Sequence, residues 1–341
     1  MNETLRKPET AYSFSGQQPG IFAGVLRDCY RGSGWLTVTG FLMALDTVIS
    51  LVGLAVDHTT VMGDPTWLKP LKFGISTTLF NLTLAYMIGH FQAGRRFAAW
   101  LGRVIAVAIV LEIVLIDMQA ARHTSSHFNV ANPFDQQVFA IMGIAIAVLY
   151  LSTALLCFIA FAVKFPDRPL GWAIRLSLVL ALAGMGSGVL MTLPTPEQKA
   201  LLHAGGGLPR SGAHTVGAPD GGSSIPLTGW SADHGDLRIA HFVGLHAMQL
   251  ILLAWWLRRR AKSTQIDQSE LTQIWLVFAV SVSIANVYAI VLVQALHGQP
   301  FLRPSGQVLT SWIAWALGSG VLLLWISTLS RRQTSLHTEN R

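Results

Sequence analysis

Charged residues and cysteines are both scarce in this sequence of 341 residues. Only 12% of the residues are Asp, Glu, Lys or Arg, whereas 52% are hydrophobic, and this balance excludes an ordinary water-soluble globular protein. Cys29 lies on the polar N-terminal segment and Cys157 lies within an apolar run, so they predict neither a disulfide framework nor a cysteine-based metal site. The composition is that of an integral membrane protein.

Eight apolar runs follow one another along the chain, each close to the ~20 residues that cross a bilayer as a helix. They cover roughly residues 35–54, 73–91, 97–118, 138–163, 170–193, 237–257, 274–296 and 308–329. The first run follows about thirty polar residues and has full length, which is typical of a retained helix and not of a cleaved signal peptide. We therefore expect an all-α integral membrane protein, with about eight transmembrane helices in one domain.

The segments around this domain, which covers residues 34–330, are polar. Residues 1–33 are interpreted as a cytoplasmic segment whose last part is either a helix on the membrane surface or a disordered entry to the bilayer. Residues 331–341 form a short tail that we also expect in the cytoplasm. Three closely spaced glycines in the fifth run and two in the eighth indicate close helix packing and add nothing about function.

The distribution of basic residues predicts the orientation in the membrane. Seventeen of the 24 Lys and Arg residues fall on the side that carries the N-terminus, and seven on the other. Because cytoplasmic loops of membrane proteins concentrate Lys and Arg, both termini are expected inside. The net charge of +7 then needs no nucleic-acid partner, and the bilayer itself is the partner that the sequence predicts.

The longest loop, residues 194–236, is expected on the extracytoplasmic side between the fifth and sixth helices. It is rich in glycine and contains Pro209, Pro219 and Pro226, so regular helix is not expected through most of it. A loop of this length is usually a lid over a site or a disordered linker. Its varied sequence, with His203 and His214 among the glycines, favours a structured lid.

Histidines gather at one membrane face. Once the eight runs are threaded through a bilayer, nine of the eleven fall at the extracytoplasmic end. They are His58, His123, His127, His203, His214, His234, His241, His246 and His297. Histidine titrates near neutral pH and is the commonest metal ligand, so this one-sided collection indicates a chemical role.

The third run carries one polar stripe. At about 100° per residue, Glu112, His123 and His127 fall on a narrow arc if the helix continues as far as His127, whereas Asp117 points elsewhere. The i, i+4 spacing of the two histidines is used by many metal sites and also arises by chance. An intramembrane carboxyl such as Glu112 carries protons, orients a ligand or bonds a neighbouring helix. Asp46 in the first run also needs a partner inside the protein.

The entrance of the sixth run is the second group of titratable residues. His241, His246 and Gln249 share one side of the helix, and His234 joins them if the helix starts early. Asp236 and Arg238 mark the mouth of this helix, which is unusual because interface anchors are mostly Trp, Tyr, Lys and Arg.

Two stretches resemble sequences found in a group of bacterial multi-pass membrane proteins without an assigned activity. They are Ser126-His127-Phe128-Asn129, and Gly235-Asp236-Leu237-Arg238 continuing through His241-Phe242, Leu245-His246 and Gln249. The resemblance covers the third run, the long loop and the sixth run. It implies a multi-pass protein of the bacterial cytoplasmic membrane and implies no reaction.

Three functions fit these patterns. The first is a redox or metal-dependent enzyme that takes a small molecule from the periplasm or the membrane. There His123, His127, His241 and His246, with His234 and Gln249 beside them, would hold Zn, Fe, Cu or a b-type haem, and Glu112, Asp236 and Arg238 would handle protons or clamp the substrate. The second is a proton-coupled transporter or channel. The third is a pH or metal sensor, or a subunit of a larger complex.

Overall fold

A computed structural model describes residues 20–261 and 269–339 of the chain. The helices are α1 (Ile21–Gly32), α2 (Gly34–Val56), α3 (Leu68–Gly89), α4 (Arg95–Ala121), α5 (Pro133–Ala162), α6 (Arg168–Thr192), α7 (Pro196–His203), α8 (Leu237–Ala261), α9 (Glu270–Leu296) and α10 (Gly306–Glu339). Two-residue strands lie between them: β1 (Thr60–Val61), β2 (Asp64–Pro65), β3 (Thr215–Val216), β4 (Ser224–Ile225), β5 (Trp230–Ser231) and β6 (Gly235–Asp236). The antiparallel pairs are β1 with β2, β3 with β6, and β4 with β5.

Six of the helices in the described residues are long and apolar enough to cross a membrane, judged by length and composition. They are α2, α4, α5, α6 (taken together with α7), α8 and α9. Helices α3 and α10 are also long, with 22 and 34 residues, and they cover the other two predicted runs. The structure therefore supports an all-α, multi-pass membrane protein, and six of the eight predicted spans meet the criterion.

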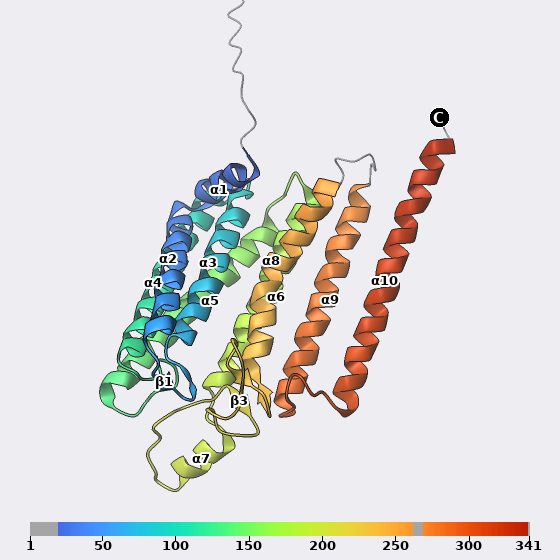
Figure 1. The fold of residues 1–341 in the computed structure, drawn as a ribbon. Helices are drawn as coiled ribbons and strands as arrows, with labels where there is room; N and C mark the ends of the chain where they lie inside the picture. The colour runs from blue at the N-terminus through green and yellow to red at the C-terminus, as the bar shows by residue number, and fades with distance from the viewer. Residues whose placement is uncertain (1–19, 262–268, 340–341) are drawn as a thin grey trace, which may run out of the picture.

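The long helices lie side by side in a bundle whose two ends differ (Figure 1). Helix α1 lies at one end, where α10 also finishes. Helix α7 and the short strands lie at the opposite end, in the connections that follow α2 and α6. The predicted lid, residues 194–236, is thus ordered into a short helix and paired strands at this end.

Polar caps define where the helices begin. The Ser33 hydroxyl accepts a hydrogen bond from Leu36 N at the start of α2, and Asn132 Oδ1 accepts one from Asp135 N at the start of α5. Such side chains satisfy backbone N–H groups that a first helical turn leaves free. Helices α5 and α6 also have proline in the first turn, where no N–H is needed.

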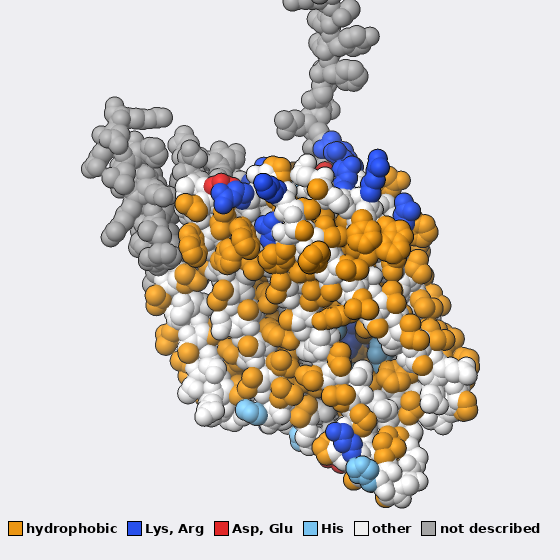
Figure 2. All heavy atoms as spheres, turned by 180° about the vertical axis from the view of Figure 1, so that it is seen from behind, with side chains coloured by type: hydrophobic (Ala, Val, Ile, Leu, Met, Phe, Trp, Pro, Cys, Tyr) orange, Lys and Arg blue, Asp and Glu red, His pale blue; other side chains and the backbone are white. Residues whose placement is uncertain are grey.

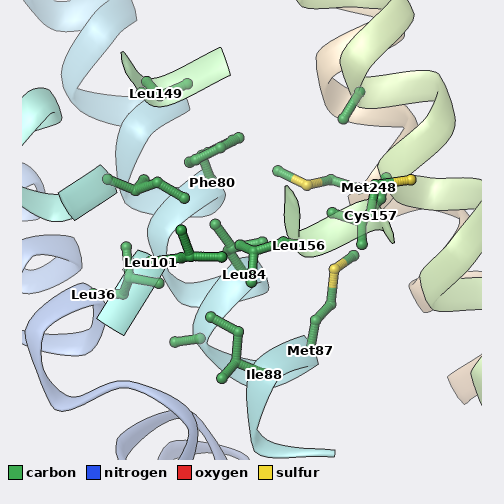
Figure 3. Close-up of a cluster of buried hydrophobic side chains, with 14 of the residues drawn as sticks. Leu36, Phe80, Leu84, Met87, Ile88, Leu101, Leu149, Leu156, Cys157 and Met248 are labelled. Atoms are coloured by element: carbon green, nitrogen blue, oxygen red, sulfur yellow. The ribbon is translucent and has the colours of Figure 1, made fainter. Parts of the chain in front are cut away.

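Apolar side chains are distributed as expected for a lipid environment. A buried cluster joins α2 through α5 to α8, with Leu36, Leu84, Leu101, Leu156 and Met248 all at most 1% exposed (Figure 3). The outer surface between the bundle ends is apolar as well, and most Lys and Arg side chains in this view gather near one end (Figure 2). An outward apolar face that would be costly in water is what a bilayer accommodates.

Two glycines let α6 and α8 cross closely. A Cβ atom placed on Gly184 would lie 2.5 Å from Leu245 N, and Gly244 faces Gly184 from the other helix. Small residues at such a crossing allow backbones to approach and pack. The crossing fixes the first turns of α8, which carry the histidines predicted to be functional.

Candidate functional site

A cavity of about 1410 Å³ lies among α3, α4, α5, α6 and α8 and reaches the loops at the end of the bundle opposite α1. Its polar wall is concentrated in the first turns of α3 and α8, the loop after α4 and the lid. Its polar and charged side chains include Lys69, Lys72, Ser76, Glu112, His127, Arg210, His214, Asp220, His234, Arg238, His241, His246 and Gln249. Most of the residues predicted from sequence therefore share one cavity.

Lys69, His127 and Glu112 form a continuous chain of contacts at the wall. Lys69 Nζ lies 2.9 Å from His127 Nδ1, and His127 Nε2 lies 3.2 Å from Oε1 of Glu112, which is 3% exposed. Burial lowers the pKa of His127, and the nearby Lys69 lowers it further, so this imidazole is neutral near pH 7. An ammonium, an imidazole and a carboxylate are thus aligned beside the cavity.

His123 lies apart from this chain. The condition for the polar stripe, a helix that continues as far as His127, is not met, because α4 ends at Ala121 and His123 takes a left-handed φ of 53°. The chain then reverses, and Thr124 N donates to Gln119 O. His123 Nδ1 instead contacts the Thr59 hydroxyl at 2.9 Å, its side chain is 52% exposed, and it is not among the cavity residues. The reversal sends His127 inward and His123 outward.

The residues of α8 face the cavity from its other side. His241 Nδ1 lies 2.8 Å from Gly184 O, and because a carbonyl only accepts, this nitrogen carries the hydrogen and Nε2 is left as an acceptor. His246 Nε2 lies 3.1 Å from the Ser76 hydroxyl. Gln249 Nε2 donates to Thr83, while the buried Gln249 Oε1 has no hydrogen-bond partner in the described part of the chain.

Asp236 and Arg238 form a structural pair at the mouth. Asp236 is 1% exposed, accepts hydrogen bonds from Arg238 Nε at 3.0 Å and from Ser231 N at 2.8 Å, and is absent from the cavity wall. Arg238 also donates to Gly229 O at 2.6 Å. The pair therefore ties β5 and the lid to α8, and of the two only Arg238 reaches the cavity.

The lid contributes a second buried network, which the sequence did not single out. The Asp220 carboxylate accepts from the backbone N–H groups of His214 and Thr215 and lies 3.1 Å from His214 Nδ1. Burial lowers the pKa of His214 to about 4, although Asp220 opposes the shift. Arg210 lies 3.5 Å from Asp220. The lid is thus held in one shape by its own buried charges, which agrees with the structured interpretation.

The two lysines of α3 differ from the other cations of the wall. Lys72 Nζ donates to Thr228 O of the lid at 2.6 Å, and Lys69 contacts His127. Among the side chains that the structure describes, those of residues 20–260 and 269–322, neither ammonium has a carboxylate oxygen within 4.0 Å, whereas Arg238 and Arg210 both do. Their spacing of i, i+3 on a helix places the two amines on neighbouring positions.

A transition-metal or haem site receives no support from this geometry. Within the described residues, no three or more His, Cys, Asp or Glu side chains are placed to hold a metal ion. His127, His241, His246 and His234 line one cavity, but they do not converge into a ligand set, and His123 points away. We therefore derive no step through a metal or haem.

Comparison of the chain with models of protein families, with curated proteins and with solved structures finds no match.

Proposed function

We propose that the protein crosses a bacterial cytoplasmic membrane eight times, with α3 and α10 as the seventh and eighth spans beside the six described above. Both termini lie in the cytoplasm and the cavity opens toward the extracytoplasmic side in this arrangement. The excess of Lys and Arg at the end of the bundle near α1 supports this orientation (Figure 2). The resemblance of the stretches around His127 and Asp236 to bacterial multi-pass proteins supports the choice of membrane.

We further propose that the cavity binds an anionic small molecule and that His127 exchanges a proton with it. The observation that carries the proposal is the pair of ammonium groups, Lys69 and Lys72, which line the cavity without a carboxylate within 4.0 Å in the described chain. A half-buried charge without a carboxylate partner is costly, so a ligand that supplies an anion between them is stabilising.

The contacts of His127 define its part in the reaction. In the free protein, Lys69 donates to Nδ1, so the hydrogen of the neutral ring lies on Nε2 and faces Glu112. A bound anion draws the Lys69 ammonium toward itself and leaves Nδ1 free to accept a proton, which comes from a ligand that carries an acidic hydrogen or, for acetate, from solvent. The Glu112 carboxylate then stabilises the imidazolium, as an orienting carboxylate does in general-base catalysis.

Two further features support a polar ligand in the cavity. Both carboxyl oxygens of Glu112 and the Gln249 Oε1 atom are buried and have no hydrogen-bond partner within the described residues, since the 3.2 Å contact of Glu112 Oε1 with His127 Nε2 is an ion-pair contact without hydrogen-bond geometry. Buried polar atoms in native proteins are almost always paired, with protein, water or ligand. The His241 Nε2 atom is a third acceptor on the same wall.

Binding of simple anions to the protein in lipid nanodiscs tests the proposal. Inorganic phosphate, acetate and dodecyl phosphate are the probes, and binding is measured by calorimetry for wild type and for Lys69→Met and Lys72→Met. At least one probe should bind wild type, and each variant should weaken that binding by about tenfold or more, as expected for a lost charge-assisted contact. Lys199→Met, on the exposed face of α7, is the matched control and should bind like wild type.

Two histidine variants test the proton-transfer part of the proposal separately from anion binding. His127→Gln should abolish the uptake of a proton from solvent that accompanies the binding of acetate, which brings no acidic hydrogen, and the binding enthalpy should then no longer depend on the ionisation enthalpy of the buffer. His123→Gln should leave this uptake unchanged, because His123 lies outside the cavity. Failure of all three anions to bind wild type, or unchanged binding in both lysine variants, contradicts the proposal.

A further inference from the structure

We infer that the ligand is a lipid-chain molecule with an anionic headgroup, which enters the cavity sideways from the membrane between α5 and α6. The inference rests on the anion site proposed above and adds the class of ligand and its route.

The wall of the cavity is amphipathic along the membrane normal. Its end near the lid carries Lys69, Lys72 and His127, whereas its deeper part is lined mainly by Phe80, Leu149 and similar apolar side chains, with Gln249 among them. Phe80 lies twelve positions after Leu68, the first residue of α3, which corresponds to about 18 Å along the helix. A small soluble anion makes no favourable contact with an apolar extension of this length, whereas a hydrocarbon chain fills it.

The side of the cavity is open toward the apolar surface. Gly143, Ile146 and Ala147 of α5 and Val189 of α6 line the cavity and are also exposed, with Ile146 at 41% and Val189 at 59%. Figure 2 shows a hollow in the apolar surface, with a Lys or Arg and a His side chain inside it. Basic and imidazole groups are therefore reached from the region that faces lipid.

The connections of the two helices place this opening at the lid end. Helices α5 and α6 are joined at their other ends by residues 163–167, and Arg175 of α6 donates there to Ala160 O and Val163 O. The helices are held together at that end, so they can separate toward the lid. A chain enters through this separation with its headgroup level with the lysines.

The lid lies across the aqueous end of the same cavity. Lys72 donates to Thr228 O and Arg238 donates to Gly229 O, so two of the cations of the wall are bonded to the lid backbone. The buried Asp220 network holds the other half of the lid. An anion from the periplasm has to pass this bonded segment, whereas a lipid anion does not, and this favours the lipid as the source of the negative group.

A comparison of two probes with the same anionic group distinguishes the sources. Binding of dodecyl phosphate and of inorganic phosphate is measured by calorimetry on the full protein in phosphatidylcholine nanodiscs. Dodecyl phosphate should bind at least about tenfold more tightly, because its chain leaves water for the apolar part of the cavity. Phosphatidic acid added to the nanodiscs should compete with it.

A bulky residue at the side opening tests the route. A Cβ atom on Gly143 meets nothing within 4 Å, so a side chain can start there without strain, and Gly143→Trp places a large ring at the opening. The variant should weaken dodecyl phosphate binding by about tenfold and leave inorganic phosphate binding unchanged. Gly318→Trp, on α10 and equally free of neighbours, is the matched control. Ala147→Leu is the second blocking variant if Gly143→Trp does not fold.

The outcomes separate this inference from the function on which it rests. Equal affinity for the two phosphates, or full dodecyl phosphate binding in both blocking variants, overturns the lipid inference while the anion site stands. Unchanged binding of both phosphates in Lys69→Met and Lys72→Met overturns the anion site itself.

Discussion

Lys69 Nζ lies 2.9 Å from Nδ1 of His127, and this contact determines which ring nitrogen carries the hydrogen. A protonated Lys69 can only donate, so Nδ1 is then the acceptor and the hydrogen lies on Nε2, 3.2 Å from Glu112 Oε1. The imidazole therefore joins a cation and a carboxylate while remaining neutral itself. Removal of either neighbour should change how readily His127 takes up a proton.

Lys69→Met should raise the pKa of His127. Burial is the main cause of the lowered pKa and persists in the variant, but the Coulombic effect of Lys69 is lost while Glu112 continues to favour the imidazolium. The measurement is an NMR titration of ¹³C-labelled histidine in nanodiscs, with His127→Gln assigning the signal. Lys199→Met should leave the titration where it is in wild type. An unchanged or lower pKa in Lys69→Met contradicts the contact.

The lid should lose stability as the pH falls from about 6.5 toward 4. His214 has a pKa of about 4 in the folded protein, so the unfolded chain, with a pKa of about 6.5, binds more protons in this window. Asp220, whose pKa is held below its usual value by His214 and Thr215 although burial opposes this, loses its contribution at still lower pH. Both effects destabilise the fold in the same direction.

His214→Gln tests this pH dependence. The neutral amide removes the proton that the unfolded chain takes up, so the fall in Tm between pH 6.5 and 4.5 should be shallower than in wild type. The positive groups facing this ring, Arg238 and Lys69, keep it neutral and remain in the variant. His203→Gln, on the exposed α7, serves as the control and should keep the wild-type slope. A steeper or identical slope in His214→Gln contradicts the assignment.

Asp236→Ala should strongly destabilise the protein, although the sequence suggested a catalytic carboxylate at this position. Asp236 is 1% exposed and holds Arg238, so its removal leaves a half-buried guanidinium without its carboxylate partner and an apolar side chain among buried N–H groups, at a cost of about 3 kcal/mol. Thermal unfolding in detergent, followed by circular dichroism, gives the change. Asp233→Ala breaks the exposed pair with Arg303 and should change Tm little. Similar Tm values for the two variants would show that Asp236 is not structural.

Hydrophobicity predicted the helices well and their ends less well. All eight apolar runs are helical in the described residues, because a span of about twenty apolar residues satisfies its backbone groups only as a helix. Helix α3 begins at Leu68, five residues before the predicted run, since Lys69 and Lys72 extend the helix without adding hydrophobicity. Their charge makes these lysines central to the proposed site, and the same charge excludes them from an apolar run.

The site depends on chain reversals that periodicity does not describe. A continuous helix would place His123 beside His127, but the left-handed residues His123 and Phe128 break the helical path. The contact between Asp46 and Asp117 was likewise unpredicted, because it joins α2 to α4 across the bundle. Sequence reasoning found residues with the right chemistry and the right end of the molecule, whereas their pairing required the packing of separate elements.

The crossing of α6 and α8 connects this packing to the site, and Gly184→Ala tests it. The new Cβ atom would lie 2.5 Å from Leu245 N and 2.6 Å from Gly244 C, so α8 has to move away, at a cost of about 1–3 kcal/mol. Because His241 Nδ1 donates to Gly184 O, the displacement also weakens the bond that fixes this ring. We expect a lower Tm and weaker dodecyl phosphate binding together.

Gly186→Ala, two residues along the same helix, is the matched control for this prediction. The nearest neighbour of a Cβ atom there is the Tyr150 hydroxyl at 3.9 Å, which is ordinary contact. The two variants make the same chemical change in the same helix and lose the same conformational freedom of the unfolded chain. A difference in Tm between them therefore reports the crossing alone, and equal Tm values would show that α6 and α8 do not need the close approach that holds His241 against the cavity.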